Sequence, residues 1–465
     1  MHLQTSDSNN LLSLPAFSRF RKSRDSKYLR YFLAAVLAFW VIPVCAVDAQ
    51  GPSGSAAGPD DKTASTAAPS AGQTRSITIA DAVSIFLQQN LELAAARYDV
   101  DLVDAEKLSA GLRPNPEIEF EAGDVPVEFG PSLIRPDKYS YGISQTFELG
   151  GKRQKRVDAA NRESELAEAE FQVVLWQMTS DVKRKFYSVL LTKSLLDLAR
   201  ENETTFAQIV DHTNDVFKLG EISGLDLRRL EIEKLKFDTD VANAERDYAL
   251  ALRDLRFTLG GDYRTMDIEA AGSIDYYKLY DFSAADLRDK AIAARPDLKA
   301  AKLSETAADA SIRLENAQRI PDITLGASVE TVPGAGSTYN VGFSIPIPLS
   351  DRNQSERAKA LIQKRRAQND QAFIANKILN DVDKAVVAYQ IQKRRVELYK
   401  NGVLTKINDV QTMTEVALKE GESSILELLD SIRTRRDALA EFYQAIFDYQ
   451  MSLLDLELAT ATPIQ

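Results

Sequence analysis

The segments Pro116-Glu-Ile-Glu-Phe120 and Pro321-Asp-Ile-Thr-Leu325 share one pattern, a proline followed by alternating polar and apolar residues. A second alternating segment follows each of them, Tyr139-Ser-Tyr-Gly-Ile-Ser144 in the first case and Thr338-Tyr-Asn-Val-Gly-Phe-Ser344 in the second. Alternation with a period of two residues predicts β-strands that have one apolar and one polar face. The sequence therefore predicts two strand pairs of the same design.

The surroundings of the two strand pairs also match. An apolar helical segment precedes each pair, beginning at Asn90 and at Arg295, and a long helical run follows each pair. Corresponding residues lie about 200 to 205 positions apart, which indicates a duplicated structural unit. We therefore predict a first repeat over residues 78–260, an inter-repeat segment over 261–294 and a second repeat over 295–465.

The helical run over residues 152–218 contains no proline and would be about 100 Å long if it were helical throughout. Its apolar residues recur at helical spacings, which predicts a coiled-coil-like seam. Gly220 and Gly421 lie near the ends of the two long runs, and a left-handed glycine can end a helix there. Ser223 or Ser423 can cap the helix that follows. Each repeat is thus predicted to contain a helical hairpin; the alternative is one continuous helix that tolerates the glycine.

A sheet with one apolar face fits two settings. In a soluble protein this face packs on a core, whereas in an outer-membrane barrel it contacts lipid while the polar face lines water. Four strands cannot close a membrane barrel, because the smallest known barrels have about eight. An open sheet edge is not tolerated in lipid, so the membrane alternative requires several chains. Three chains would supply twelve strands.

The N-terminus has the order of parts of a secretory signal peptide. Basic residues gather in the range 19–30, an apolar run occupies 31–44, and small residues at 47–49 offer a cleavage site. A transmembrane anchor is the alternative, but about 14 apolar residues are few for a bilayer. We therefore assign residues 1–49 to a signal peptide.

Cys45 is the only cysteine of the chain and lies at the end of this apolar run. It is either removed with the signal peptide or acylated as the first residue of a lipoprotein, although Val44 before it is a poor match to a lipoprotein signal. Residues 50–77 are rich in Gly, Ser, Ala and Pro and are predicted to be a disordered linker.

Charge and residue chemistry exclude several classes of function. The formal net charge is −11 and no basic domain stands out, which argues against a nucleic-acid-binding protein. The only histidines are His2 and His212, so a transition-metal site built from nitrogen and sulfur is not expected. The run Gly150-Gly151-Lys152 lacks the remaining spacing of a phosphate-binding loop, and His212 has no nucleophile turn near it in the sequence. We therefore predict no enzyme activity, no metal site and no cofactor.

Together, the repeat, the strand pairs and the long helices resemble the TolC-like outer-membrane efflux factors over about residues 78–460. Two segments, Phe147-Glu-Leu-Gly-Gly-Lys-Arg153 and Ile345-Pro-Ile-Pro-Leu-Ser-Asp-Arg-Asn-Gln354, resemble the strand-to-helix junctions of the heavy-metal (cobalt–zinc–cadmium, CzcC-like) branch. Glycine and proline pairs of this kind end a strand, and the chain can continue from there as a helix.

The resemblance implies a mainly α-helical protein with membrane β-strands. Four strands from each of three chains would form a twelve-stranded outer-membrane β-barrel, and the helical hairpins would form a periplasmic α-barrel of twelve helices. Residues 78–90, residues 261–294 and the C-terminal region would form a belt around the helices.

The resemblance also implies a periplasmic gate. In this family, acidic residues shortly after the tip glycines narrow the entrance, and here these positions are Asp226, Glu427 and Asp430. Three copies of each carboxylate around one axis would repel one another and favour cations. The alternative is an ordinary solvated helix face. Ser423 stands where the best-known relative has a basic partner, so a lock at this residue is not implied.

The two turns are the implied contacts with a periplasmic adaptor and, through it, with an inner-membrane pump of the resistance–nodulation–division (RND) type. The predicted adaptor-contacting residues are Leu219, Gly220, Glu221, Leu418, Glu420, Gly421 and Glu422. Their alternative role is simply to close the hairpins.

The sequence thus predicts a homotrimeric exit duct for heavy-metal cations, located in the outer membrane and extending into the periplasm. Its partners would be the adaptor, the pump and outer-membrane lipid, with no nucleic acid. Multidrug efflux and type I protein secretion are the alternatives within this class. A secreted coiled-coil structural protein is the alternative outside it.

Overall fold

The computed structural model describes residues 75–123, 138–220, 222–275, 277–420 and 422–464. The elements of the first repeat are β1 (Arg75–Ile77), α2 (Ile79–Gln89), α3 (Leu91–Ala110), β2 (Glu117–Gly123), β3 (Lys138–Phe147), α4 (Lys152–Lys218) and α5 (Gly224–Leu259). Between the repeats lie the 3₁₀ turn η1 (Gly261–Arg264), β4 (Ile268–Ala270) and α6 (Ala284–Ala294). The second repeat contains α7 (Pro296–Gln318), β5 (Ile323–Val332), β6 (Gly336–Ser344), α8 (Gln354–Leu398), the π-helical turn η2 (Tyr399–Val403), α9 (Leu404–Lys419) and α10 (Ile425–Thr460).

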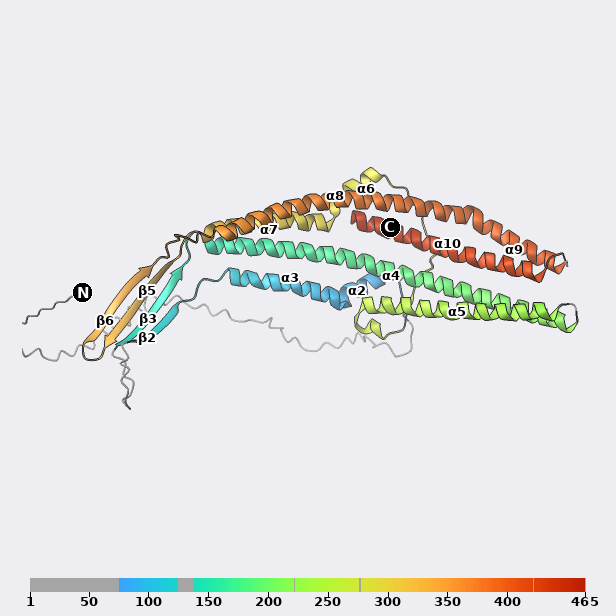
Figure 1. The fold of residues 1–465 in the computed structure, drawn as a ribbon, viewed down its shortest axis with the longest axis horizontal. Coiled ribbons are helices and arrows are strands. Elements are labelled where there is room, and N and C mark those ends of the chain that lie inside the picture. Colours follow the sequence, from blue (N-terminus) through green and yellow to red (C-terminus); the bar gives the residue numbers. More distant parts are fainter. Residues whose placement is uncertain (1–74, 124–137, 221, 276, 421, 465) are drawn as a thin grey trace, which may run out of the picture. The chain divides into compact units, whose positions relative to one another are not determined.

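The four predicted strands form one antiparallel sheet in the order β2-β3-β5-β6 (Figure 1). Its register places Ile118 opposite Ile143, Ile143 opposite Ala327 and Ala327 opposite Val341. The alternating apolar residues of all four strands therefore share one face, as the sequence predicts. Within the described residues β2 and β6 each pair on one side only, so the sheet has two open edges.

Each strand pair passes into a long helix through a residue in the left-handed conformation. Gly151 has a φ of 69° and precedes α4, and Asn353 has a φ of 57° and precedes α8. Glycine adopts this conformation without a steric penalty, and asparagine tolerates it better than most residues do. The junctions therefore occupy equivalent positions in the two repeats and confirm the predicted strand-to-helix transitions.

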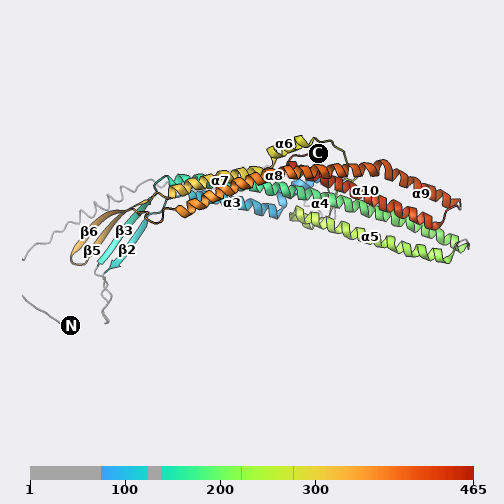
Figure 2. The same cartoon turned by 45° about the horizontal axis from the view of Figure 1, so that its top comes forward.

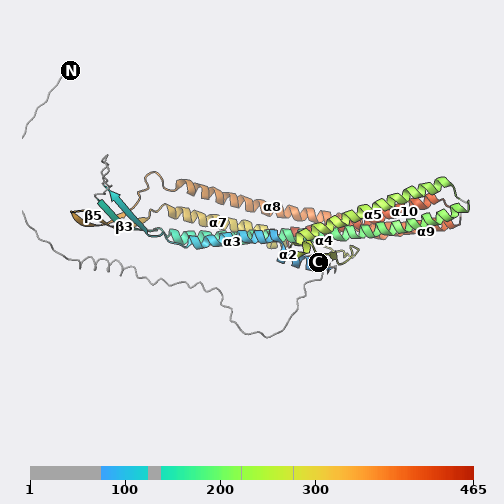
Figure 3. The ribbon, with the colours of Figure 1, turned by 90° about the horizontal axis from the view of Figure 1, so that it is seen from below.

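The long helices of the two repeats pack side by side (Figures 1, 2 and 3). Near the sheet the contacts follow the order α3-α4-α7-α8, and farther from the sheet they follow α5-α4-α10-α9. The short helices α3 and α7 cover the first part of the long runs, and α5 and α10 return along the second part. Helix α4 runs for 67 residues without interruption, as predicted, whereas its counterpart is divided by η2 into α8 and α9.

The chain reverses at both predicted turns. Helix α4 ends at Lys218, Gly220 takes a left-handed φ of 83°, and Ser223 caps α5 by accepting a hydrogen bond from a backbone N–H. The single continuous helix is therefore the wrong alternative. In the second repeat the cap is Ser424 and not Ser423, because Ser424 forms a capping box with Glu427.

The main core lies where the inter-repeat segment meets the long helices. It includes the fully buried side chains of Phe86, Val189, Leu255 and Tyr449. Among the described residues, no helix combines the length and the apolarity that crossing a bilayer requires. A second, smaller core cluster lies close to the turns and consists of Phe206, Leu230, Phe237, Leu428, Leu429 and Ile432.

The predicted boundary of the linker differs from the structure. The signal peptide assigned to residues 1–49 and the linker over 50–74 lie outside the described residues. The last three residues of the predicted linker, Arg75–Ile77, instead form β1, which pairs in parallel with β4. Burial of Ile77 in the main core and backbone pairing with β4 explain why this segment is ordered.

Candidate functional site

The two turns present most of the predicted contact residues to solvent. Leu219 is 76% exposed, and Gly220, Glu420 and Glu422 are exposed as well. Leu418 differs from the prediction, because its side chain packs partly buried against the second core cluster. Glu221 and Gly421 lie outside the described residues.

A groove between the two hairpins adjoins these turns. It has a volume of about 420 Å³ and is lined by α4, α9, α10 and Ile222 of the first turn; its lining residues include Ile209, His212, Val216 and Ile425. Most of these side chains are apolar, which is typical of a surface that binds another molecule. Sequence reasoning missed this groove, because it forms only when the two hairpins pack together.

The three predicted gate carboxylates lie in different local environments. Asp226 is partly buried and forms an ion pair of 3.5 Å with Arg229, one turn later on α5. Glu427 accepts hydrogen bonds of 2.5 Å from the Ser423 hydroxyl and 3.0 Å from the Ser424 N–H. Its carboxylate therefore points back to the N-terminus of α10.

The capping contacts also determine the charge of Glu427. The hydroxyl of Ser423 and the N–H of Ser424 stabilise the ionised form and lower the pKa of the Glu427 carboxyl below its ordinary value. Glu427 therefore stays negatively charged at neutral pH. Asp430, one turn farther along α10, is exposed.

Ion pairs tie the two hairpins together above the turns, and an aromatic contact joins the two helices of the first hairpin. The buried carboxylate of Glu233 on α5 lies 2.5 Å from the guanidinium of Arg433 on α10, and Asp240 lies 3.0 Å from Arg436. The rings of Phe206 and Phe237 stack with centroids 4.7 Å apart. The two ion pairs hold α5 and α10 together near the predicted gate residues, and the stacked rings hold α4 and α5 together.

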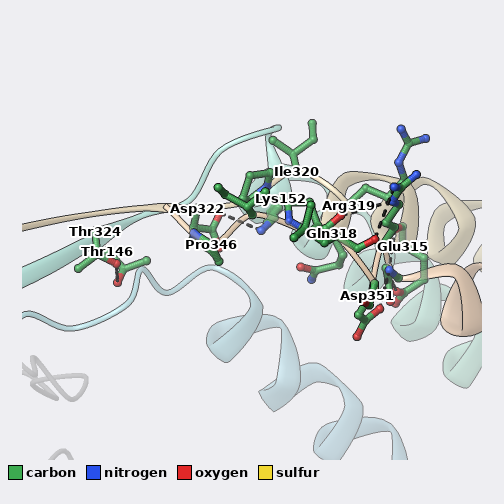
Figure 4. A pocket seen from close by; sticks show the side chains of 17 residues that line it. Thr146, Lys152, Glu315, Gln318, Arg319, Ile320, Asp322, Thr324, Pro346 and Asp351 are labelled. Carbon is green, nitrogen blue, oxygen red and sulfur yellow. Dashed lines mark hydrogen bonds and ion pairs between the residues drawn. The ribbon is translucent and has the colours of Figure 1, made fainter. Parts of the chain in front are cut away.

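At the other end of the helices, a cavity of about 940 Å³ marks the passage from sheet to helix (Figure 4). Lys152, which is 5% exposed, forms an ion pair of 2.8 Å with Asp322, and the hydroxyls of Thr146 and Thr324 lie 2.9 Å apart. The ion pair links the start of α4 to the start of β5. It therefore holds the two repeats together at the end of the sheet where the central strands β3 and β5 meet the helices.

The described residues contain no cluster of three or more His, Cys, Asp or Glu side chains that could hold a metal ion. His212 lies in the apolar groove between the hairpins. The arrangement is thus one of packed hairpins, turns and a sheet with an apolar face.

Comparison with known proteins identifies relatives of this chain. The sequence model of the outer membrane efflux protein family matches residues 82–261 and 287–462. The cobalt-zinc-cadmium resistance protein CzcC of Cupriavidus metallidurans is 26% identical over 380 residues, which cover 79% of this chain and 88% of that protein. The nickel-cobalt-cadmium resistance protein NccC of Alcaligenes xylosoxydans is 25% identical over 291 residues, covering 61% and 64%.

Solved structures share the fold. A crystal structure of CusC, described in terms of folding and transmembrane channel formation, superimposes with a TM-score of 0.68 at 18% identity, covering 85% of this chain and 95% of that one. The two matched regions coincide closely with the two repeats and leave out most of the segment between them. The chain therefore belongs to the outer membrane efflux protein family.

Proposed function

We propose that three copies of this chain form the exit duct of a tripartite efflux system that exports heavy-metal cations across the outer membrane. The observation that carries the proposal is a sheet with one continuous apolar face and two open edges, attached to long helices. An apolar face needs lipid or a core to cover it, and open edges in lipid need strand partners. The metal-resistance names of the two relatives support the choice of cargo.

Three copies would supply twelve strands for a barrel around a wide pore. The edges β2 and β6 of one chain would pair with those of its neighbours. The long helices would continue the duct into the periplasm, and the two turns would contact the periplasmic adaptor of an RND-type pump. We assign no metal site to the duct, so the adaptor and the pump would select the metal.

The alternatives within the same class are multidrug efflux and type I protein secretion, and no feature of the sheet or the helices favours either. A secreted coiled-coil rod is disfavoured, because it would leave the apolar face of the sheet exposed to water.

Loss of this protein is expected to lower the tolerance of its cell to cobalt, zinc or cadmium several-fold, while tolerance to organic drugs stays unchanged. The measurement is the lowest inhibitory concentration of each compound in a deletion strain, with and without the gene on a plasmid. The opposite pattern, drug sensitivity with normal metal tolerance, would replace the metal assignment by drug efflux. Release of the protein by osmotic shock without detergent would exclude the duct.

The proposed gate consists of Asp226, Glu427 and Asp430 at the entrance. Replacing Glu427 by Gln together with Asp430 by Asn removes two charges per chain; glutamine also serves at this position of a capping box, so the start of α10 stays capped. We expect a lower preference for cations and a weaker block by multivalent cations in planar bilayers. The matched control is Glu420→Gln with Glu422→Gln at the turn. Unchanged selectivity and block in the first double variant would end the gate assignment.

A further inference from the structure

A cavity of about 390 Å³ lies in the second repeat where α10 ends and α7 begins. Helices α7 and α10 both pack against α4 and α8, one after the other along the molecule (Figure 1). The lining of the cavity includes Asp297 in the first turn of α7 and Ala459 in the last turn of α10. Helix α4 contributes Trp176 and Gln177, and α8 forms the opposite wall. The cavity is therefore enclosed by elements of both repeats.

The acidic side chains of this cavity already have cationic partners. Arg295 donates two hydrogen bonds to Asp297, at 2.6 and 3.0 Å, and its guanidinium lies 3.2 Å from the carboxylate of Asp381. Asp455 pairs with Arg184 of α4. Each lining carboxylate thus has an arginine partner.

Several donor groups of the cavity, by contrast, lack an acceptor. Among the described residues, the ammonium groups of Lys377 and Lys384 and the indole N–H of Trp176 form no hydrogen bond or ion pair. With Arg184 counted, four cationic and three acidic side chains gather here, although the chain as a whole has a formal charge of −11. The cavity is therefore locally positive and rich in free donors, which suits an anion.

The arrangement of the two lysines defines the shape of this anion. Lys377 and Lys384 both line the cavity and are two helical turns apart on α8, so their backbone positions are separated by about 10 Å. Part of the wall is apolar and consists of Ala385, Ala388 and Leu458. A ligand that uses the whole cavity thus needs two anionic groups and an apolar part.

We propose that this cavity binds a small organic anion that carries two carboxylate or phosphate groups on a short apolar body. Lys377 and Lys384 each bind one of the charged groups, and the indole N–H of Trp176 donates to one of them. The apolar body packs on the wall that the alanines form. The bound molecule joins α8 to α4 at the point where α10 gives way to α7.

The position of the cavity along the helices indicates where the ligand comes from. Because α4 begins at Lys152 next to the sheet and rises about 1.5 Å per residue, Trp176 lies about 36 Å along the helix. The headgroups of a membrane around the sheet cannot reach that far, since they extend only about 5–8 Å beyond the hydrocarbon core. The ligand is therefore a soluble molecule. The site is separate from the duct proposed above and needs only one copy of the chain.

Tryptophan fluorescence tests the site directly. The chain contains two tryptophans, Trp40 and Trp176, so the full-length variant Trp40→Phe keeps only the one that lines the cavity. We expect adipate, a six-carbon dicarboxylate, to change the fluorescence of Trp176 saturably in detergent at neutral pH and constant ionic strength. Adipate should also raise the midpoint of thermal unfolding, because a ligand that binds only the folded state stabilises it. A titration with neither saturation nor a raised midpoint would overturn the proposal.

A pair of lysine variants tests the assigned contacts in the same background. Lys377→Gln with Lys384→Gln is expected to weaken adipate binding at least about ten-fold, because it removes both charge-assisted contacts. The matched control is Lys234→Gln with Lys406→Gln, which removes the same charge outside the cavity. An equal loss of affinity in both double variants would show a general attraction of anions to the protein and would refute the site.

A second ligand tests the assignment of one carboxylate to each lysine. Hexanoate has the same number of carbons as adipate but a single carboxylate. We expect the Trp40→Phe protein to bind hexanoate at least several-fold more weakly than adipate, and the Lys377→Gln, Lys384→Gln variant to bind both equally weakly. Equal affinities of the Trp40→Phe protein for the two ligands would contradict the two-point assignment. A protein that binds adipate but fails to export metal would overturn only the proposed function.

Discussion

Replacing Arg295 by Ala is expected to lower the free energy of unfolding by about 3 kcal/mol, because it leaves two carboxylates without their shared partner. The Arg295 side chain is 5% exposed and donates bidentate hydrogen bonds to Asp297, at 2.6 and 3.0 Å. It also reaches Asp381 on α8 at 3.2 Å and lies over the ring of Trp176 on α4, 5.1 Å from its centroid. One guanidinium thus joins α7, α8 and α4.

The measurement is urea denaturation of the purified protein in detergent, followed by the helical circular dichroism signal. The control is Arg313→Ala, which removes an ion pair of 2.8 Å between Arg313 and Asp158 in the same interface. The Arg313 side chain is 46% exposed and that of Asp158 is 32% exposed, so water screens the pair and the expected cost is only about 0–1 kcal/mol. Equal costs for the two variants would contradict the structural role assigned to Arg295.

Replacing Phe237 by Ala is expected to cost about 3–5 kcal/mol and to loosen the ends of the hairpins near the turns. Phe237 is 1% exposed, stacks on Phe206 and carries the guanidinium of Arg436 5.5 Å from its ring centroid. The second core cluster is small, so the loss of one ring leaves few apolar contacts between the hairpins there.

Hydrogen exchange should localise this effect. We expect faster exchange in the parts of α4, α5 and α10 that contribute to the second core cluster, and unchanged exchange in the main core. Phe237→Leu, which keeps more of the side-chain volume, should give a clearly smaller effect. Uniform acceleration throughout the molecule would show that the cluster does not act as a separate unit.

The spacing of the apolar residues and the positions of proline and glycine made much of the fold predictable. The proline-free run over 152–218 coincides with α4, and the strand pairs lie where alternation and prolines place them. Family membership followed from the order of these parts and is confirmed by the match of the family model to both repeats. The π-helical turn at 399–403 was not predicted, because helical periodicity alone does not reveal a local change in hydrogen bonding.

Local chemistry near the turns was harder to predict. The segment Ser424-Ile-Leu-Glu427 has the spacing of a capping box, and this signal would have assigned Ser424 and the orientation of Glu427 from the sequence. The inward orientation of Leu418 and the groove that contains His212 depend on how two hairpins pack together. No pattern within one helix contains that information. The assignments of the gate and of the adaptor contacts stay predictions.

The unequal long runs of the two repeats have a mechanical consequence. Helix α4 keeps the i to i−4 hydrogen-bond pattern of an α-helix from the sheet to the turn. It is therefore expected to bend and twist as one continuous helix. In the long helical run of the second repeat, the backbone hydrogen bonds change at Tyr399–Val403 from the α-helical to the wider π-helical spacing for one turn. We therefore expect the second run to bend or twist more readily at this turn than α4 does along its length.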